Sequence, residues 1–119
     1  MSNAAISVSL YAAYAIATTA GLLLVKAWFP AARQAWAASD WLAGGSIAVV
    51  AGALLYVASF LIWLAIVERH PLTIAYPVAI GIAMITLSAG AAFFLHETLD
   101  AVRLVGMGLI VLGTVLVVR

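Results

Sequence analysis

The sequence predicts an all-α integral membrane protein, a bundle of four transmembrane helices. Four stretches contain no Lys, Arg, Asp or Glu, and they occupy residues 1–25, 41–67, 71–95 and 104–118. A helix needs about 20 mostly apolar residues to cross roughly 30 Å of hydrocarbon. Three stretches exceed that length, and the last reaches it by including residues from Ala101 onward. The chain is 68% hydrophobic, with a mean hydropathy of +1.27, and so small a soluble domain could not hide this apolar surface.

The first helix is expected over about residues 6–25. It ends before Lys26, whose ammonium can reach the membrane interface while its stem stays in apolar surroundings. The next segment, residues 26–40, mixes aromatic residues with Pro30 and Arg33. That mixture is typical of the headgroup region, so we expect a connector there. The whole chain, residues 1–119, is expected to be one domain.

The other three helices are expected at about residues 41–67, 72–95 and 101–118. Pro71 lies in the turn Glu68-Arg69-His70-Pro71 and marks the end of one helix and the start of the next. A second polar turn, His96-Glu97-Thr98-Leu99-Asp100, precedes the last helix. Asp100 is well placed to cap that helix at its N-terminus.

The composition argues against several classes of function. A net charge of +1 predicts no nucleic-acid partner, because a nucleic-acid groove needs clustered Lys and Arg. With no cysteine and only His70 and His96 as imidazoles, we expect no metal and no cofactor. No carboxylate pair and no Ser/His/Asp constellation lies at membrane depth, so we expect no catalytic residue and no enzyme.

Polar and aromatic side chains form two stripes with the same spacing. Each stripe follows i, i+3, i+7 spacing and therefore lies along one face of a helix. The two stripes could line a common cavity, together with Tyr76 of the third helix; alternatively, their hydroxyls satisfy one another or bond locally. The stripes comprise Tyr11, Tyr14 and Thr18 on the first helix, and Tyr56, Ser59 and Trp63 on the second.

Proline and glycine positions indicate a hinge and an interface. Pro77 removes a backbone donor inside the third helix, and such breaks often lie near a transporter's substrate site or hinge. We therefore expect a hinge at Pro77 and Gly81, the alternative being a tolerated proline without a role.

Gly106 and Gly113 are seven residues apart on one face of the last helix. They would allow close approach of another backbone, either in a dimer or within one chain.

The charges of the loops do not fix an orientation. If both termini share one side, that side carries Arg69 and Arg119, and the other carries Lys26, Arg33 and Arg103. Orientation normally follows a clear excess of Lys and Arg in cytoplasmic loops. Two basic residues on one side and three on the other leave both a single and a dual topology open.

From Tyr56 onward the sequence resembles the small multidrug resistance and EamA members of the drug/metabolite transporter superfamily. The most specific segments are "PLTIAYP", the "HETL" turn and "GMGLIVLG" in the last helix. In those families the last segment is associated with the dimer interface, which implies that role for Gly106 and Gly113.

Two departures separate the chain from the multidrug exporters of this group. Those exporters carry an essential glutamate eight residues before the lysine that corresponds to Lys26, where this chain has Thr18. They also carry a tryptophan where this chain has Ala79. "TAGLLLVK", "AYP" and "HE" make the sequence more similar to the short flippase subunits for aminoarabinose–undecaprenyl phosphate, which lack the exporter glutamate.

The resemblance implies a dimeric transporter in a bacterial inner membrane that moves a polyprenyl-phosphate-linked sugar or a similar anionic lipid. The partner would be a second copy or a similar small subunit, with membrane lipids around it. Its groove would be lined by Tyr14, Thr18, Tyr56, Ser59, Trp63 and Tyr76, and Lys26 and Arg33 would attract the phosphate. Lys26 could instead be a simple interface anchor. The alternatives for the whole chain are a small multidrug or cation exporter, and a partner subunit that does not itself transport.

Overall fold

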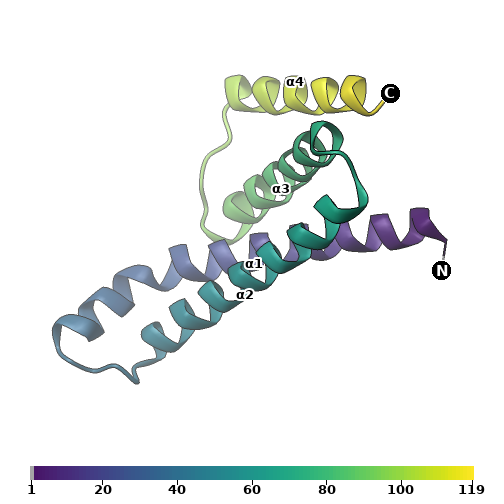
Figure 1. Ribbon diagram of the computed structural model, residues 1–119. Coiled ribbons are helices and arrows are strands. Elements are labelled where there is room, and N and C mark those ends of the chain that lie inside the picture. The colour runs from purple at the N-terminus through teal and green to yellow at the C-terminus, as the bar shows by residue number, and fades with distance from the viewer. Residues whose placement is uncertain (1) are drawn as a thin grey trace.

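The computed structural model describes residues 2–119 and contains four helices and no strand within that range. All four helices are long and apolar enough to cross a membrane, which confirms the predicted fold class of a multi-pass membrane protein (Figure 1). The turn at Pro71 is also confirmed, since His70 ends one helix and Pro71 caps the next. The helices are α1 (Asn3–Ala37), α2 (Gly44–Arg69), α3 (Leu72–Phe94) and α4 (Ala101–Val118).

The first helix differs most from the prediction, because α1 does not stop at Lys26 but continues to Ala37. The expected connector is therefore helical up to that residue. Pro30 lies inside the helix, where it removes one backbone donor and leaves the carbonyl four residues earlier without its helical partner. Alanine-rich flanks favour the helix on both sides of the proline. The added turns also pack against the start of α2, where Ala32 is fully buried.

Helices α1 and α2 form a hairpin held together by small residues. At Gly21, an added Cβ would lie 2.7 Å from the carbonyl oxygen of Gly52, and one at Gly52 would lie 2.7 Å from the carbonyl oxygen of Gly21. An added Cβ at Gly45 would lie 2.9 Å from the backbone nitrogen of Ala32. These glycines therefore let the two backbones touch, as is usual between helices in membranes.

Most large apolar side chains lie on the outside of the molecule. Within residues 2–119, Ile66 is the one large side chain that is fully buried, and the rest of the core consists mainly of Ala, Gly, Ser and Thr. Exposed side chains such as Leu54, Phe60 and Leu109 would be costly in water but are suited to contact with lipid tails. This distribution fits the bilayer as the surrounding solvent.

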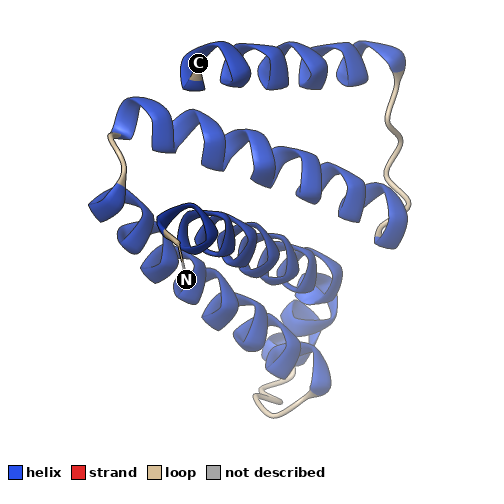
Figure 2. Cartoon of the chain, turned by 90° about the vertical axis from the view of Figure 1, so that its right-hand side faces the viewer, coloured by secondary structure: helices blue, strands red, loops and turns tan. Residues whose placement is uncertain are grey.

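The four helices do not close into a compact bundle. Among the four described helices, α3 packs mainly on α1, and α4 packs on α3 alone (Figure 2). No residue of α4 is buried, and α4 is described throughout. The radius of gyration is 16.6 Å, whereas a compact chain of this length has about 13.5 Å. The single chain is thus an open bundle with one side of α4 free.

The link between α3 and α4 is a short, well-anchored loop. His96 adopts the left-handed conformation with φ 55°, and the next backbone N–H, that of Glu97, donates to the carbonyl of Ala91 at 3.2 Å. Asp100 accepts a hydrogen bond from the backbone of Arg103 at 2.8 Å. This confirms the predicted N-cap and the predicted bounds of the last helix.

Candidate functional site

Three of the predicted substrate-binding residues form one aromatic cluster at the junction of α1, α2 and α3. The rings of Tyr14 and Trp63 have centroids 5.9 Å apart, and those of Trp63 and Tyr76 are also 5.9 Å apart. Each ring comes from a different helix, so the cluster marks the place where the three helices meet. Tyr76 is 57% exposed, which leaves the cluster open on one side.

A second group lies beside this cluster and includes a residue that the sequence pattern did not single out for binding. His70, at the end of α2, lies with its Nε2 2.9 Å from Ser7 Oγ of α1. Its ring centroid is 5.9 Å from that of Tyr11. Its place in a polar turn indicated only a helix boundary. The histidine joins the ends of two helices across this side of the molecule.

The hydroxyl groups of the two predicted stripes are in different situations. Ser59 is buried, and its hydroxyl donates to the carbonyl of Tyr56 at 2.6 Å, within its own helix. The Tyr56 ring is about half exposed. Thr18 is only 5% exposed, and its hydroxyl has no hydrogen-bond partner among residues 2–119. Of these two buried hydroxyls, that of Ser59 is bonded within its own helix, and that of Thr18 has no partner among the described residues.

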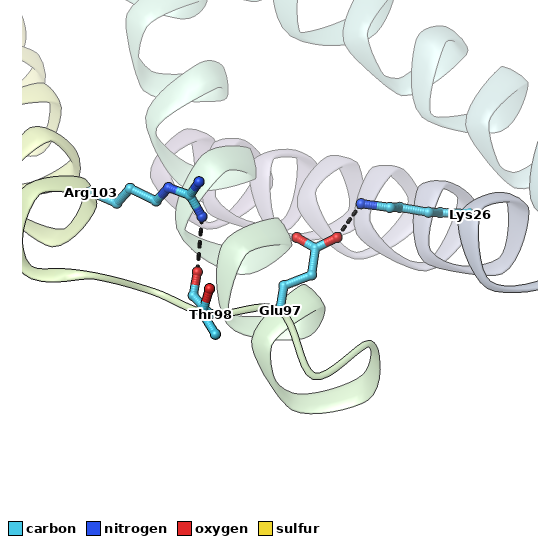
Figure 3. Close-up of polar contacts among 4 residues, drawn as sticks. All are labelled: Lys26, Glu97, Thr98 and Arg103. Carbon is cyan, nitrogen blue, oxygen red and sulfur yellow. Dashed lines mark hydrogen bonds and ion pairs between the residues drawn. The ribbon is translucent and has the colours of Figure 1, made fainter.

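Lys26 forms an ion pair with Glu97 of the α3–α4 loop, as Figure 3 shows. The two residues are 71 positions apart in sequence. Glu97 was expected to be an ordinary surface carboxylate, so the sequence pattern missed this partner. Arg33, the other basic residue predicted to attract phosphate, is exposed on the extended part of α1 and makes no ion pair with the described residues.

A large groove lies between α1 and the C-terminal part of α3. Its volume is about 620 Å³, and its walls are almost entirely apolar. Thr19 and Thr86 provide the polar atoms, with their hydroxyl oxygens 2.8 Å apart. Because Thr86 can donate to the carbonyl of Ile82 at 3.0 Å, Thr19 is the natural donor between the two helices. The remaining walls come from Ala15, Ile16, Ala20, Leu23, Leu24, Ala27, Phe94 and Leu95.

A smaller groove of about 230 Å³ continues from the large one towards the ion pair. Leu23 and Leu95 line both grooves, while Lys26 and Glu97 line only the smaller one. The two together form an apolar path along α1 with one cation and one anion at its end. Such a surface suits a molecule with a long apolar tail and a charged head.

The predicted hinge residues face α4. The hydroxyl oxygen of Thr114 in α4 lies 3.3 Å from the carbonyl oxygen of Pro77 and 2.9 Å from that of Ile110 in its own helix. An added Cβ at Gly81 would lie 3.2 Å from the same hydroxyl oxygen. Helix α3 continues through Pro77 without interruption. The predicted interface glycines, Gly106 and Gly113, have nothing within 4 Å of an added Cβ. They therefore lie on open surface of the single chain.

The described residues contain no group of three His, Asp or Glu side chains that could hold a metal ion.

Comparison with known proteins finds no matching family model and no matching solved structure. The chain is similar to two proteins that are each named "Probable 4-amino-4-deoxy-L-arabinose-phosphoundecaprenol flippase subunit ArnE", from Aeromonas salmonicida and Aeromonas hydrophila. Each is 31% identical over 78 residues, which cover 66% of this chain and 61% of the relative. The match thus spans about three fifths of these relatives' length. The fold and the comparisons together show a multi-pass helical membrane protein that is similar to two proteins named as probable flippase subunits.

Proposed function

We propose that this chain is a subunit of a transporter that moves a polyprenyl-phosphate-linked sugar, or a similar lipid with a phosphate, between the leaflets of a bacterial inner membrane. The observation that carries the proposal is the apolar groove along α1 and α3 that ends at Lys26. A polyprenyl tail can lie against the apolar wall while the phosphate meets the ammonium. The similarity to two proteins named as flippase subunits supports the same class of function.

Of the predicted binding residues, Lys26 lines the proposed path, and the aromatic cluster lies outside both grooves. Tyr14 and Lys26 are both on α1, and at 1.5 Å per residue they are about 18 Å apart along the helix axis. This separation is more than half of the roughly 30 Å hydrocarbon thickness. We assign the aromatic cluster with Trp63 and Tyr76 to one leaflet and Lys26 with Arg33 to the other. Neither groove is lined by Thr18, Tyr56 or Ser59.

We also propose that the transporter contains two such chains, either two copies or this chain with a similar small subunit. Helix α4 supports this, because it packs on α3 alone and has no buried residue. Gly106 and Gly113 present open backbone on that helix, and glycines spaced in this way favour close helix contact in membranes. The resemblance to the EamA and small multidrug resistance proteins implies the same interface.

A transfer assay in vesicles tests the proposal. The full-length chain is reconstituted alone and with a similar small subunit, and the probe is undecaprenyl phosphate carrying a fluorescent aminoarabinose. We expect the probe to become accessible to a membrane-impermeant quencher faster than in protein-free vesicles, in at least one of the two preparations. Protein-free rates in both preparations would refute the proposal.

The competing function is export of a multidrug or cationic substrate. The aromatic cluster favours it, because aromatic faces attract cations. Proton coupling, however, needs a titratable group in the membrane, and α1 carries Thr18 at the position where the exporters carry glutamate. We therefore expect no efflux of quaternary ammonium compounds driven by a pH gradient in the same vesicles. Robust proton-driven efflux would establish the exporter function in place of lipid transfer.

A further inference from the structure

The four helices form two units that are joined by one short turn. Helices α1 and α2 touch through their backbones at Gly21 and Gly52, whereas α4 packs on α3 alone. Between the two units, α3 packs mainly on α1, and the chain passes from α2 to α3 through the turn at His70 and Pro71 (Figure 1). Hinge motions are absorbed by a few residues at such element ends. The α3–α4 unit can therefore swing as one arm about this turn.

The two ends of α3 are held to the other helices in different ways. At the turn, His70 Nε2 lies 2.9 Å from Ser7 Oγ of α1, and the aromatic cluster joins the first part of α3 to both α1 and α2. Towards the other end, the large groove lies between α1 and α3. Leu23 of α1 reaches Gly90 of α3 there, since an added Cβ at Gly90 would lie 2.7 Å from its Cδ1. Flexible side chains make these contacts, and they can separate without disturbing either helix.

The hydroxyl contact inside the groove fits both a closed and an open arrangement. The hydroxyl oxygens of Thr19 and Thr86 are 2.8 Å apart. The Thr86 hydroxyl also lies 3.0 Å from the carbonyl oxygen of Ile82 in its own helix, so it keeps a partner when α3 moves away. Thr19 can then bond the carbonyl four residues earlier in α1, as threonines in helices do. Neither hydroxyl is left without a partner when the two helices separate.

The ion pair of Lys26 with Glu97 is the polar link between α1 and the arm that lies farthest from the turn, among the described residues. Glu97 moves with the arm, because its backbone N–H donates to the carbonyl of Ala91 in α3 at 3.2 Å. The side chains of Lys26 and Glu97 are 66% and 41% exposed, respectively. Ion pairs this exposed are weak, since water screens them and ordering two long side chains costs entropy. The link can therefore break and form again readily.

We propose that Lys26 and Glu97 form a latch on the α3–α4 arm. While the ion pair is formed, the arm lies against α1; when it breaks, the arm swings about the α2–α3 turn and widens the groove towards the surrounding lipid. The proposal rests on the proposed function, because the widened groove is where a carried headgroup would pass. Helix α3 has 23 residues and is about 34 Å long, so a swing of about 10° moves its far end by about 6 Å.

Spin labels on α1 and on the arm test the swing. The chain has no cysteine, so Gln34→Cys with Val102→Cys labels an exposed site on α1 and another at the start of α4. Val8→Cys with Leu72→Cys gives a reference pair of exposed sites beside the turn. Distances are measured by double electron–electron resonance on the full-length chain in vesicles, diluted with unlabelled chain so that each distance lies within one chain. We expect a narrow and a wide separation for the first pair and one separation for the reference pair. A single separation for both pairs would overturn the proposal.

Variants assign the movement to the latch. Glu97→Gln should raise the ratio of wide to narrow separations about two- to fivefold, the range that one exposed ion pair supplies. Glu68→Gln, which removes a carboxylate near the C-terminal end of α2, should leave the ratio unchanged. Lys26→Glu together with Glu97→Lys should restore the original ratio, because the pair forms again with its charges exchanged. The reference pair shows that each variant keeps its fold. An unchanged ratio in Glu97→Gln, or no restoration by the exchange, would refute the latch.

The latch can also be locked chemically, because Lys26 is the only lysine of the chain. A zero-length carbodiimide joins its amine to the Glu97 carboxylate as an amide with loss of water, and mass spectrometry of peptides identifies the product. The cross-linked chain should show only the narrow separation. A wide separation that persists in the cross-linked chain would contradict the assignment.

The vesicle transfer assay separates this inference from the proposed function. Lipid transfer by a chain whose arm does not move would refute the latch and leave the transporter standing. A swing controlled by the latch in a chain that transfers no lipid, alone or with a similar small subunit, would support the latch and refute transport.

Discussion

The contact between Gly21 and Gly52 provides the sharpest test of how α1 and α2 are held together. In Gly52→Ala, the new methyl group would lie 2.7 Å from the carbonyl oxygen of Gly21, 2.9 Å from Cβ of Leu24 and 2.9 Å from Cγ2 of Val25. The nearest of these atoms belongs to backbone, so a side-chain rotation cannot relieve the clash. The helices must move apart, and contacts along the hairpin are lost.

The cost follows from the packing. Forcing a methylene-sized group into a filled interface typically costs about 1–3 kcal/mol. Replacing glycine by alanine in a helix also gains up to about 1 kcal/mol of helix propensity, and a control must carry the same gain. Gly108→Ala is that control, since Gly108 is inside α4 and has nothing within 4 Å of an added Cβ. Gly52→Ala should therefore be less stable than Gly108→Ala by about 1–3 kcal/mol.

Reversible unfolding in mixed detergent micelles, followed by helical circular dichroism or by steric trapping, gives the two free energies of unfolding. The expected difference corresponds to a change of about 5- to 150-fold in the unfolding equilibrium. If Gly52→Ala were as stable as Gly108→Ala, the two backbones would not be in contact at this point. The described packing of α1 on α2 would then be wrong.

Three further predictions concern other parts of the chain. Thr18→Val should raise the free energy of unfolding by about 1 kcal/mol, because it removes a buried hydroxyl without a partner; a lower unfolding temperature would reveal a partner for that hydroxyl in the bilayer. Asp100→Ala should cost about 0.5–2 kcal/mol of local stability, seen as faster amide exchange at Arg103, and unchanged exchange there would contradict the cap. Gly113→Leu should reduce crosslinked dimer in membranes, and an undiminished dimer would move the interface away from α4.

Local sequence signals predicted the positions of the turns and the last helix. Pro71 and Asp100 act through their own backbone neighbours, so a proline that cannot continue a helix and a carboxylate that caps one are visible in the sequence. The absence of charge over long stretches predicted four helices for a similar reason, because each span must satisfy its own backbone within the bilayer.

These local sequence signals could not predict contacts between segments that are far apart in the sequence. The extension of α1 to Ala37 depends on Ala32 packing against Gly45, while Pro30 and the aromatic residues around it are typical of a connector. The pairing of Lys26 with Glu97 joins two segments that no spacing rule relates. The chain has nine glycines, and periodicity alone does not identify Gly21 and Gly52 as the pair that touches.

The exposed position of α4 has a consequence for the shape of the surrounding bilayer. Its 18 residues span about 27 Å, a little less than the roughly 30 Å of an average hydrocarbon core. Helix α1, with 35 residues, extends well beyond that thickness. A helix of this length meets the hydrocarbon by thinning the bilayer, by letting flanking side chains reach the interface or by oligomerising, each at a cost of fractions of a kcal/mol per Å of mismatch. Two short helices placed side by side share one thinned region, so hydrophobic mismatch itself draws α4 towards a second short helix.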